Sequence, residues 1–257
     1  MHPPTGPPLA GLSAIGAYDS IAATYDAQQS GDEWMRRTLH AHYLRVFRPA
    51  QRVLDVGCGT GTDALLLAQH GINVVAIDGA AGMIGQLRAK ASGLEGLIAG
   101  QVLPIDELHR LDGPFDGAYS SFAGLSTVDL AQFAQQAHRL IRPRGRMVLH
   151  MLNRLSLWEW LGSRRIHPPN ATQRSFTIGG HPVAHRLYFP GEAYGYFAEG
   201  FALKQMYSLG ALRPPHTVRR LPHRLVQRLE WFDLRAGGLP GVRSAGRFFV
   251  LDLERRP

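Results

Sequence analysis

The sequence predicts an α/β protein built on a mostly parallel sheet with helices on both faces. Short apolar runs alternate with longer helical patterns from residue 52 onward, a spacing typical of βαβ units. A glycine-rich turn interrupts the stretch 52–84 between two apolar runs, as expected where a ligand packs against backbone. The chain has 257 residues, 45% of them hydrophobic, which suffices for one sizeable core.

The expected elements of the first 152 residues follow one another closely. A helical segment covers residues 15–47 and ends before Pro49. We then expect strands at residues 52–57, 73–78, 96–100, 115–122 and 145–152. Helices between them are expected at residues 62–71, 80–92 and 129–141.

The pattern changes after Met151. Residues 155–165 read as a short amphipathic helix, and Gly179-Gly180 separates two β-prone runs, which predicts a hairpin. Pro190 suits the first turn of a further helix. The remaining elements are expected at residues 201–212 (strand), 219–232 (basic helix) and 246–256 (strand).

These patterns predict a single domain over residues 15–257, after a flexible leader at residues 1–14. The segment 151–189 is too short for a core of its own, so we interpret it as an insertion that covers the substrate. The parts of the domain are then a helical cap (15–50), a ligand-binding core (51–150), the insertion (151–189) and a helix–strand completion (190–257).

Charge is distributed unevenly. Residues 1–150 carry 12 basic and 13 acidic side chains, whereas residues 151–257 carry 16 and 7, so the whole excess behind the net charge of +8 lies in the second part. Such an excess could attract an anionic substrate, a membrane surface or RNA, although an arginine-rich composition also follows from codon bias alone.

Several features exclude other classes of protein. No apolar run approaches the roughly 20 residues that span a bilayer, and the N-terminus lacks the cationic start of a signal peptide. Cys58 is the only cysteine, which excludes an intrachain disulfide and a cysteine zinc cluster. We therefore expect a cytoplasmic protein without a metal site.

The glycine turn has the spacing Asp55-x-Gly57-x-Gly59-x-Gly61. A dinucleotide-binding turn would need G-x-G-x-x-G, but Thr62 occupies the third glycine position, and no Gly-Lys-Ser/Thr follows for a P-loop. Since the turn follows a strand and opens a helix, its backbone amides face the ligand. A bulky side chain at Gly57 or Gly59 should block that ligand.

The stretch "VLDVGCGTGTDALLLA", followed by "VVAID", resembles the cofactor-binding half of class I S-adenosylmethionine-dependent methyltransferases. "YDSIAATYD" resembles the N-terminal segment of small-molecule members, including quinone-biosynthesis methyltransferases. "FDGAYSSFAGL" and "AHRLIRPRGRMVLHM" resemble the fourth strand, its following helix and the fifth strand. The resemblance covers roughly residues 15–151, and it implies a Rossmann-like seven-stranded sheet and S-adenosyl-L-methionine as cofactor.

The cofactor would contact residues near the strand ends. An ionised Asp78 can accept hydrogen bonds from both ribose hydroxyls, though it could instead cap the next helix. By resemblance, Asp55 helps to bind the ammonium end and Tyr25 reaches the carboxylate end. Met83 would pack on the ribose or adenine, while Ile105 and Asp106 would contact the adenine; core or surface roles remain open for these residues. The expected cofactor-binding set is Tyr25, Asp55, Gly57, Gly59, Gly61, Asp78, Met83, Ile105, Asp106 and Ser120.

Methyl transfer requires alignment of the acceptor and exclusion of water, with a base only where the acceptor loses a proton. His150, late in the fifth strand, is the expected general base, with a structural histidine as the alternative. Acceptor contacts are expected near strand ends and on the insertion, at Ser121, Asn153, Tyr188 and Tyr194.

The expected reaction is therefore methyl transfer to a small organic acceptor, anionic or lipophilic. The signatures of amino-adenine and cytosine-C5 methylases are absent, since "SSFA" follows the fourth strand and no Pro-Cys occurs. Two alternatives stay open: an RNA methyltransferase that uses the basic C-terminal half, and a non-catalytic cofactor-binding regulatory module. Arg220, Arg224 and Arg228 line one stripe of the basic helix, which could contact an anionic membrane but more simply docks its leucines on the sheet.

Overall fold

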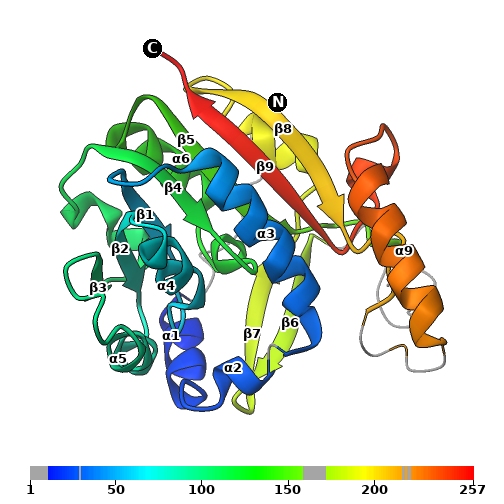
Figure 1. Cartoon of the computed structure of the whole chain (residues 1–257), viewed down its shortest axis with the longest axis horizontal. Helices are drawn as coiled ribbons and strands as arrows, with labels where there is room; N and C mark the ends of the chain where they lie inside the picture. The colour runs from blue at the N-terminus through cyan, green and yellow to red at the C-terminus, as the bar shows by residue number, and fades with distance from the viewer. Residues whose placement is uncertain (1–10, 29, 159–171, 216–217, 219–220) are drawn as a thin grey trace.

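Figure 1 shows a computed structural model of the chain, which describes residues 11–28, 30–158, 172–215, 218 and 221–257. One seven-stranded sheet has the order β3-β2-β1-β4-β5-β9-β8. The first five strands are parallel, β9 is antiparallel to β5, and β8 is antiparallel to β9. The strands are β1 (Arg52–Val56), β2 (Asn73–Asp78), β3 (Ile98–Val102), β4 (Phe115–Ser120), β5 (Ile141–Leu152), β8 (Phe201–Leu209) and β9 (Phe248–Arg255). The predicted α/β class with a mostly parallel sheet is confirmed.

Helices cover both faces of this sheet and enclose two separate cores. One core joins the strands to α3 (Glu33–Val46), α4 (Thr62–Gln69) and α5 (Ala81–Lys90). The other joins them to α6 (Leu130–Leu140), α8 (Pro190–Gly195) and the 3₁₀ turn η2 (Ile105–Arg110). The layers place the carboxyl ends of the parallel strands at one edge, where ligands of open α/β sheets bind.

The N-terminal helical segment is broken into pieces. It consists of α1 (Gly11–Ser20), α2 (Tyr25–Gln28), a 3₁₀ turn η1 (Ser30–Asp32) and α3. Since α1 begins at Gly11 and Ala14 is buried, residues 11–14 belong to the folded part and not to the expected leader.

The strand boundaries differ from the prediction by up to four residues. β3 lies two residues later than expected, at Ile98–Val102. β5 begins at Ile141, directly after α6 and four residues earlier than expected. Ile141 is fully buried and is the register partner of Phe115 in β4. Burial of Ile141 overrides the turn that Pro143 and Gly145 suggest in the sequence.

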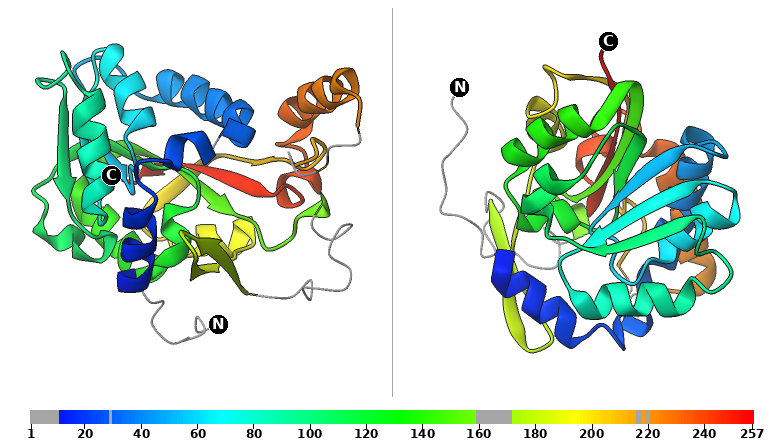
Figure 2. Two further views of the ribbon diagram at one scale, coloured as in Figure 1. Left: turned by 90° about the horizontal axis from the view of Figure 1, so that it is seen from below. Right: turned by 90° about the vertical axis from the view of Figure 1, so that its left-hand side faces the viewer.

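The hairpin predicted within residues 174–189 is present. It joins β6 (Gln173–Ile178) to β7 (His181–Arg186) through Gly179 and Gly180, both at positive φ. Its apolar side packs on α1, with Ile178 and Val183 against Ala14 and Ala17. Figure 2 shows this hairpin beside α1, away from the main sheet. Of the helix expected at residues 155–165, residues 159–165 lie outside the described part of the chain.

The C-terminal basic helix is α9 (His223–Ala236), which starts after Pro222, four residues later than expected; η4 (Val242–Ser244) precedes β9. Arg220 lies outside the described residues. None of the helices in the described part of the chain is long and apolar enough to cross a membrane.

Candidate functional site

A pocket opens at the carboxyl ends of β1, β2 and β4, beneath the N-terminal helices. It encloses about 740 Å³, including space open to solvent. Its polar lining includes Asp78 and Asp106, and its apolar lining includes Met83 and Ile105. The remaining lining residues are Ala14, Ile15, Tyr18, Tyr25, Gly57, Gly59, Gly79, Pro104, Ser121, Phe122, Gly124, Thr127 and Val128.

The three glycines of the turn have different surroundings. All three adopt positive φ, at 70° for Gly57, 54° for Gly59 and 78° for Gly61, a region that favours glycine. Gly57 and Gly59 line the pocket, and a Cβ on Gly59 would lie 3.5 Å from the Tyr25 ring. Gly61 is instead buried, and a Cβ there would meet Leu87 of α5 at 2.5 Å. Its role is therefore close packing between α5 and the glycine turn, not contact with the pocket.

Asp78 ties the glycine turn to the end of β2. Its Oδ2 accepts a hydrogen bond from the Gly59 amide and its Oδ1 from the Ala80 amide, each at 2.9 Å. Burial raises the pKa of this carboxyl, while the two backbone hydrogen bonds lower it in part. The carboxylate still has lone pairs that face the pocket, since each oxygen accepts only one amide.

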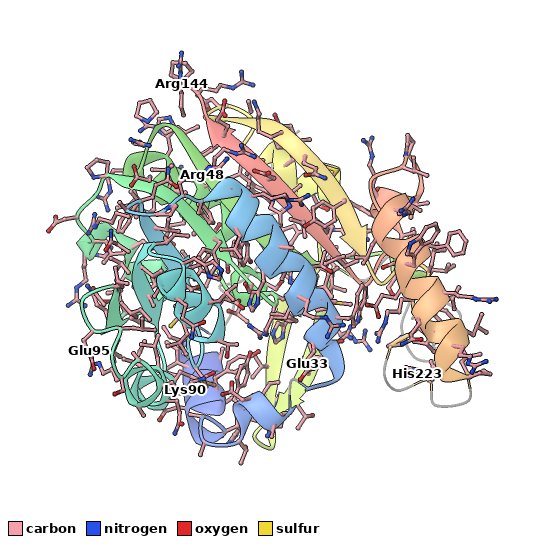
Figure 3. All side chains as sticks on the ribbon, in the orientation of Figure 1. Glu33, Arg48, Lys90, Glu95, Arg144 and His223 are labelled. Atoms are coloured by element: carbon pink, nitrogen blue, oxygen red, sulfur yellow. The ribbon has the colours of Figure 1, made fainter. Side chains whose placement is uncertain are left out.

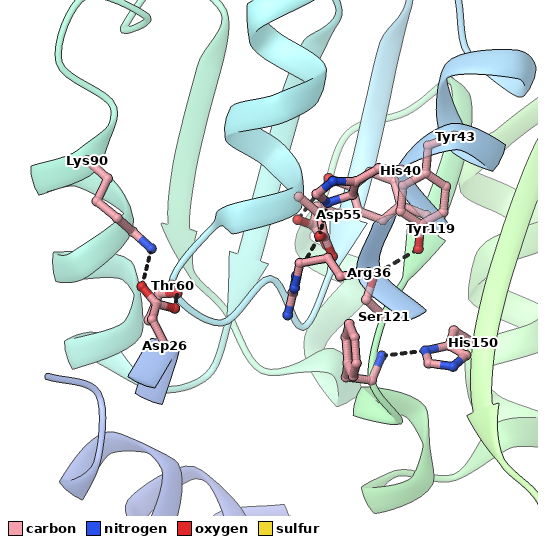
Figure 4. Close-up of polar contacts among 12 residues, drawn as sticks. Asp26, Arg36, His40, Tyr43, Asp55, Thr60, Lys90, Tyr119, Ser121 and His150 are labelled. Carbon is pink, nitrogen blue, oxygen red and sulfur yellow. Dashed lines mark hydrogen bonds and ion pairs between the residues drawn. The ribbon is translucent and has the colours of Figure 1, made fainter. Parts of the chain in front are cut away.

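The N-terminal segment roofs the pocket through specific polar contacts. Asp19 of α1 accepts a hydrogen bond from the Gly82 amide at 2.6 Å, next to the start of α5. Asp26 of α2 pairs with Lys90 at 2.8 Å and accepts a hydrogen bond from Thr60 (Figure 4). These contacts fasten α1 and α2 to the sheet domain.

A smaller compartment continues the pocket toward α3 and α4. The two share Tyr25, Gly57, Gly59, Ser121 and Phe122, and the smaller one adds Arg36, Asp55, Cys58, Thr60, Thr62 and Asp63. The two compartments therefore adjoin, and the smaller one carries the charged side chains Arg36, Asp55 and Asp63.

Arg36 provides the cation of the smaller compartment. Its guanidinium pairs with Asp63 at 2.5 Å and lies over the Phe122 ring at 4.4 Å from the centroid. His40 contacts the same Asp63 oxygen at 2.7 Å (Figure 4). Although burial alone would raise it, the pKa of Asp63 is held well below its ordinary value by Arg36 and His40.

Asp55 occupies the floor of the same compartment. Its carboxylate is buried and accepts a hydrogen bond from Tyr119 at 2.9 Å. Burial, and next the charge of Asp63, raise its pKa well above the ordinary value. A cationic group in this compartment would counteract both effects.

His150 does not line either compartment. It is buried behind Phe122, whose amide donates a hydrogen bond to its Nδ1 at 3.1 Å, and its ring lies 4.4 Å from that of Phe248. Nε2 has no hydrogen-bond partner among the described residues. Burial lowers the pKa of the ring to about 3, so the imidazole is neutral near pH 7. Its expected role as a general base stays a prediction.

The other expected residues divide into two groups. Tyr25, Asp78, Met83, Ile105, Asp106 and Ser121 lie together on the pocket wall. Ser120, Asn153, Tyr188 and Tyr194 line neither compartment.

The hydrogen bonds of this second group are structural. Ser120 donates to the carbonyl of Val56 at 2.8 Å, and the Asn153 side chain donates to two carbonyls before β9. Tyr194 donates to the carbonyl of Phe201 at 3.3 Å. The Tyr188 side chain is fully buried in the core between sheet and helices.

Sequence reasoning missed several wall residues. Tyr18 lies in the N-terminal motif, whose resemblance to small-molecule enzymes could have pointed to it. Arg36 carries no local signal, because it is one of several arginines on an amphipathic helix. Ile15, Phe122, Thr127 and Val128 complete the apolar wall and are ordinary apolar or small residues in sequence.

Comparison with known proteins finds similarity to methyltransferases. Residues 53–145 match a family profile described as "Methyltransferase domain". The chain is 35% identical over 141 residues to a demethylmenaquinone methyltransferase of Beutenbergia cavernae, covering 52% of this chain and 55% of the relative. It is 32% identical over 147 residues to the ubiquinone/menaquinone biosynthesis C-methyltransferase UbiE of Geotalea daltonii, covering 51% of this chain and 60% of the relative. The chain thus spans a little over half the length of these relatives.

Solved structures share the fold at low sequence identity. The CcbJ methyltransferase from Streptomyces caelestis superposes with a TM-score of 0.61 at 19% identity, covering 94% of this chain and 98% of that one. The 1,6-didemethyltoxoflavin-N1-methyltransferase of Burkholderia thailandensis, solved with bound 1,6-didemethyltoxoflavin and S-adenosylhomocysteine, gives a TM-score of 0.58 at 17% identity, covering 100% of this chain and 94% of that one. The chain therefore has the fold of class I S-adenosylmethionine-dependent methyltransferases, and its residues 53–145 are similar to a methyltransferase domain.

Proposed function

We propose that this chain transfers a methyl group from S-adenosyl-L-methionine to a small lipophilic acceptor. The observation that carries the proposal is the pair of adjoining compartments around Gly57 and Gly59, one apolar and carboxylate-lined and the other charged. That polarity suits a ligand with a nucleoside at one end and an amino acid at the other. The absence of side chains at Gly57 and Gly59 leaves a cradle for the part between.

The larger compartment suits the nucleoside. Asp78 would accept hydrogen bonds from the ribose hydroxyls, and Asp106 from the adenine amino group. Met83 and Ile105 supply apolar surface for the ring. Burial raises the pKa of Asp106, with Asp129 and Glu107 adding to the effect, and hydrogen bonds from the ligand would favour its ionised form.

The smaller compartment suits the amino-acid end. Arg36 would pair with the ligand carboxylate, while Asp55 would attract the ammonium group. Since Asp55 is buried beside Asp63, a cation near it offsets both the burial and the repulsion. Tyr25 lies between the compartments and would close over the ligand.

When bound, the cofactor supplies an electrophilic methyl group on a sulfonium. The protein must align the acceptor and exclude water. The roof made by α1 and α2, which the hairpin β6–β7 supports from outside, serves that purpose. Within the predicted insertion, the hairpin β6–β7 would accordingly act as a cover.

The acceptor would occupy the apolar wall that the cofactor leaves free. That wall comprises Ala14, Ile15, Phe122 and Val128, with the hydroxyl of Thr127. Among the described residues that line the two compartments, Arg36 is the only Arg or Lys, and Asp63 pairs with it, so these linings offer no cationic track for an RNA backbone. The relatives named above include a demethylmenaquinone methyltransferase, so a demethylated quinol ring is the first acceptor to test.

Calorimetric titration with S-adenosylmethionine and S-adenosylhomocysteine, at low and high salt, tests the first half of the proposal. Binding at micromolar concentration supports it, and its absence in well-folded protein rejects it. Labelled methyl transfer to a panel of quinols and to RNA then tests the acceptor. Transfer to RNA alone would support the RNA alternative, and cofactor binding without transfer to any acceptor would favour the regulatory module.

A further inference from the structure

Helix α9 stands apart from the pocket and projects from the end of the sheet (Figure 1). It follows β8, whose carboxyl end lies at the same edge of the sheet as those of β1–β5. Asp233 is its only fully buried residue. This is little burial for a helix of 14 residues, so its outer face needs an explanation.

The inward face of α9 is acidic, contrary to the expectation that its leucines dock on the sheet. Asp233 accepts hydrogen bonds from the amides of Gly210 and Leu212, at 2.7 and 2.6 Å. Glu230 pairs with Arg213 at 2.9 Å. Both carboxylates of the helix are thereby turned toward the body of the protein.

The outward face combines arginines with large apolar side chains. Arg224, Arg228 and Arg235 are exposed, and no ion pair among the described residues neutralises them. Between them lie Trp231, 49% exposed, and Phe232, 52% exposed, with Leu225 at 41%. The Arg235 guanidinium lies over the Trp231 ring at 4.1 Å, so charge and aromatic surface form one patch.

Exposed apolar residues are concentrated here. Of the ten large hydrophobic side chains that are exposed in the described part of the chain, five fall within residues 225–239. Large exposed apolar patches on a protein surface mark interaction sites. A patch that carries three arginines, no outward carboxylate and two aromatic rings matches a surface with negative headgroups above an apolar layer.

We propose that the outer face of α9 docks onto an anionic phospholipid bilayer. Arg224, Arg228 and Arg235 would contact the headgroups, while Trp231, Phe232 and Leu225 enter the boundary below them. The docked orientation would bring the pocket edge of the sheet toward the bilayer. The proposal needs no methyl transfer, so its failure is distinguishable from that of the proposed function.

Vesicle sedimentation of the full chain tests this docking. Wild type should bind vesicles of equal parts phosphatidylcholine and phosphatidylglycerol, and not pure phosphatidylcholine. The variant R224Q/R228Q/R235Q should lose on the order of 100-fold in partition coefficient. The variant W231S/F232S should also lose binding, because the apolar insertion is removed.

A matched control carries the same change in charge elsewhere. Arg48, Arg144 and Arg256 are exposed, and Figure 3 shows Arg48 and Arg144 at the other end of the molecule from His223, the first residue of α9. The variant R48Q/R144Q/R256Q should bind vesicles as wild type does. An equal loss in this control, full vesicle binding by W231S/F232S, or binding to an anionic oligonucleotide but not to vesicles would overturn the proposal.

Discussion

The amide of Gly59 donates a hydrogen bond to the Asp78 carboxylate at 2.9 Å, across 19 residues of sequence. This contact joins the glycine turn after β1 to the end of β2, and places the carboxylate on the pocket wall. The glycine turn and the aspartate at the end of β2 both suggested a nucleoside site in the sequence, and the structure joins them directly. Several predictions about the site depend on this geometry.

Replacement of Asp78 by alanine should weaken binding of S-adenosylhomocysteine by about 1–3 kcal/mol, because charge-assisted hydrogen bonds to the ribose are lost. Calorimetry measures the effect. The loss should be found for adenosine and be absent for 2′,3′-dideoxyadenosine, which lacks both hydroxyls. An equal loss for the two nucleosides would instead assign Asp78 to support of the glycine turn.

Replacement of Gly59 by alanine should mainly weaken cofactor binding, whereas replacement of Gly61 by alanine should mainly lower stability. Gly59→Ala should cost about 1 kcal/mol of stability through its positive φ, while cofactor affinity falls at least about tenfold as the methyl group fills the cradle. Gly61→Ala should lower the free energy of unfolding by about 2–4 kcal/mol, since its Cβ meets Leu87. Urea unfolding and calorimetry on both variants separate the effects; reversed outcomes would contradict the assignment.

Arg36→Gln should reduce cofactor affinity at least about tenfold if the guanidinium pairs with the ligand carboxylate. His40→Gln is the matched control, because His40 contacts the same Asp63 oxygen but does not line either compartment. Binding of adenosine, which has no carboxylate, should be unchanged in Arg36→Gln. A similar loss of affinity in both variants would show that Arg36 acts only through Asp63.

Replacement of His150 by alanine should slow methyl transfer and leave cofactor affinity unchanged. His150→Gln distinguishes the two ways this can arise, because the glutamine carbonyl can still accept the Phe122 amide but does not act as a base. Retained turnover in His150→Gln would assign the histidine to positioning of Phe122. Undiminished turnover in His150→Ala would remove it from the reaction altogether.

His150 should also make the protein sensitive to acid. Its folded pKa is about 3 against an ordinary value of 6.5, so between these values the unfolded chain binds a proton that the folded chain does not. Its contribution to stability is therefore complete above about pH 6.5 and is lost as the pH falls toward 3. The free energy of unfolding of wild type should fall more steeply than that of His150→Gln, by up to about 1.4 kcal/mol per pH unit. Parallel curves for the two proteins would contradict this.

The sequence alone determined the fold class and the residues that are proposed to bind the nucleoside. The alternation of strands and helices dictates a parallel sheet, and Gly57, Gly59 and Asp78 fall at strand ends, where topology brings them together. Such local signals suffice because the turn, the strand end and the motif are short-range features of the chain.

The acceptor side was less predictable. Asn153, Tyr188 and Tyr194 were expected there, but they hold loops or fill the core, whereas Ile15, Phe122 and Val128 line the pocket. A side chain in or beside a strand or helix can point toward a ligand or away from it. Only the packing of neighbouring elements selects between these directions.

Packing between neighbouring elements also decides which face of α9 turns inward and what Gly61 contacts. The pattern of α9 is compatible with leucines turned inward, but the amides of Gly210 and Leu212 need acceptors, and Asp233 provides them. Gly61 belongs to the motif, yet the approach of Leu87 decides its role. The sequence determined which residues could bind a nucleoside, while long-range contacts in the tertiary structure decided which side chains face the site, because burial and hydrogen bonding are settled between distant segments.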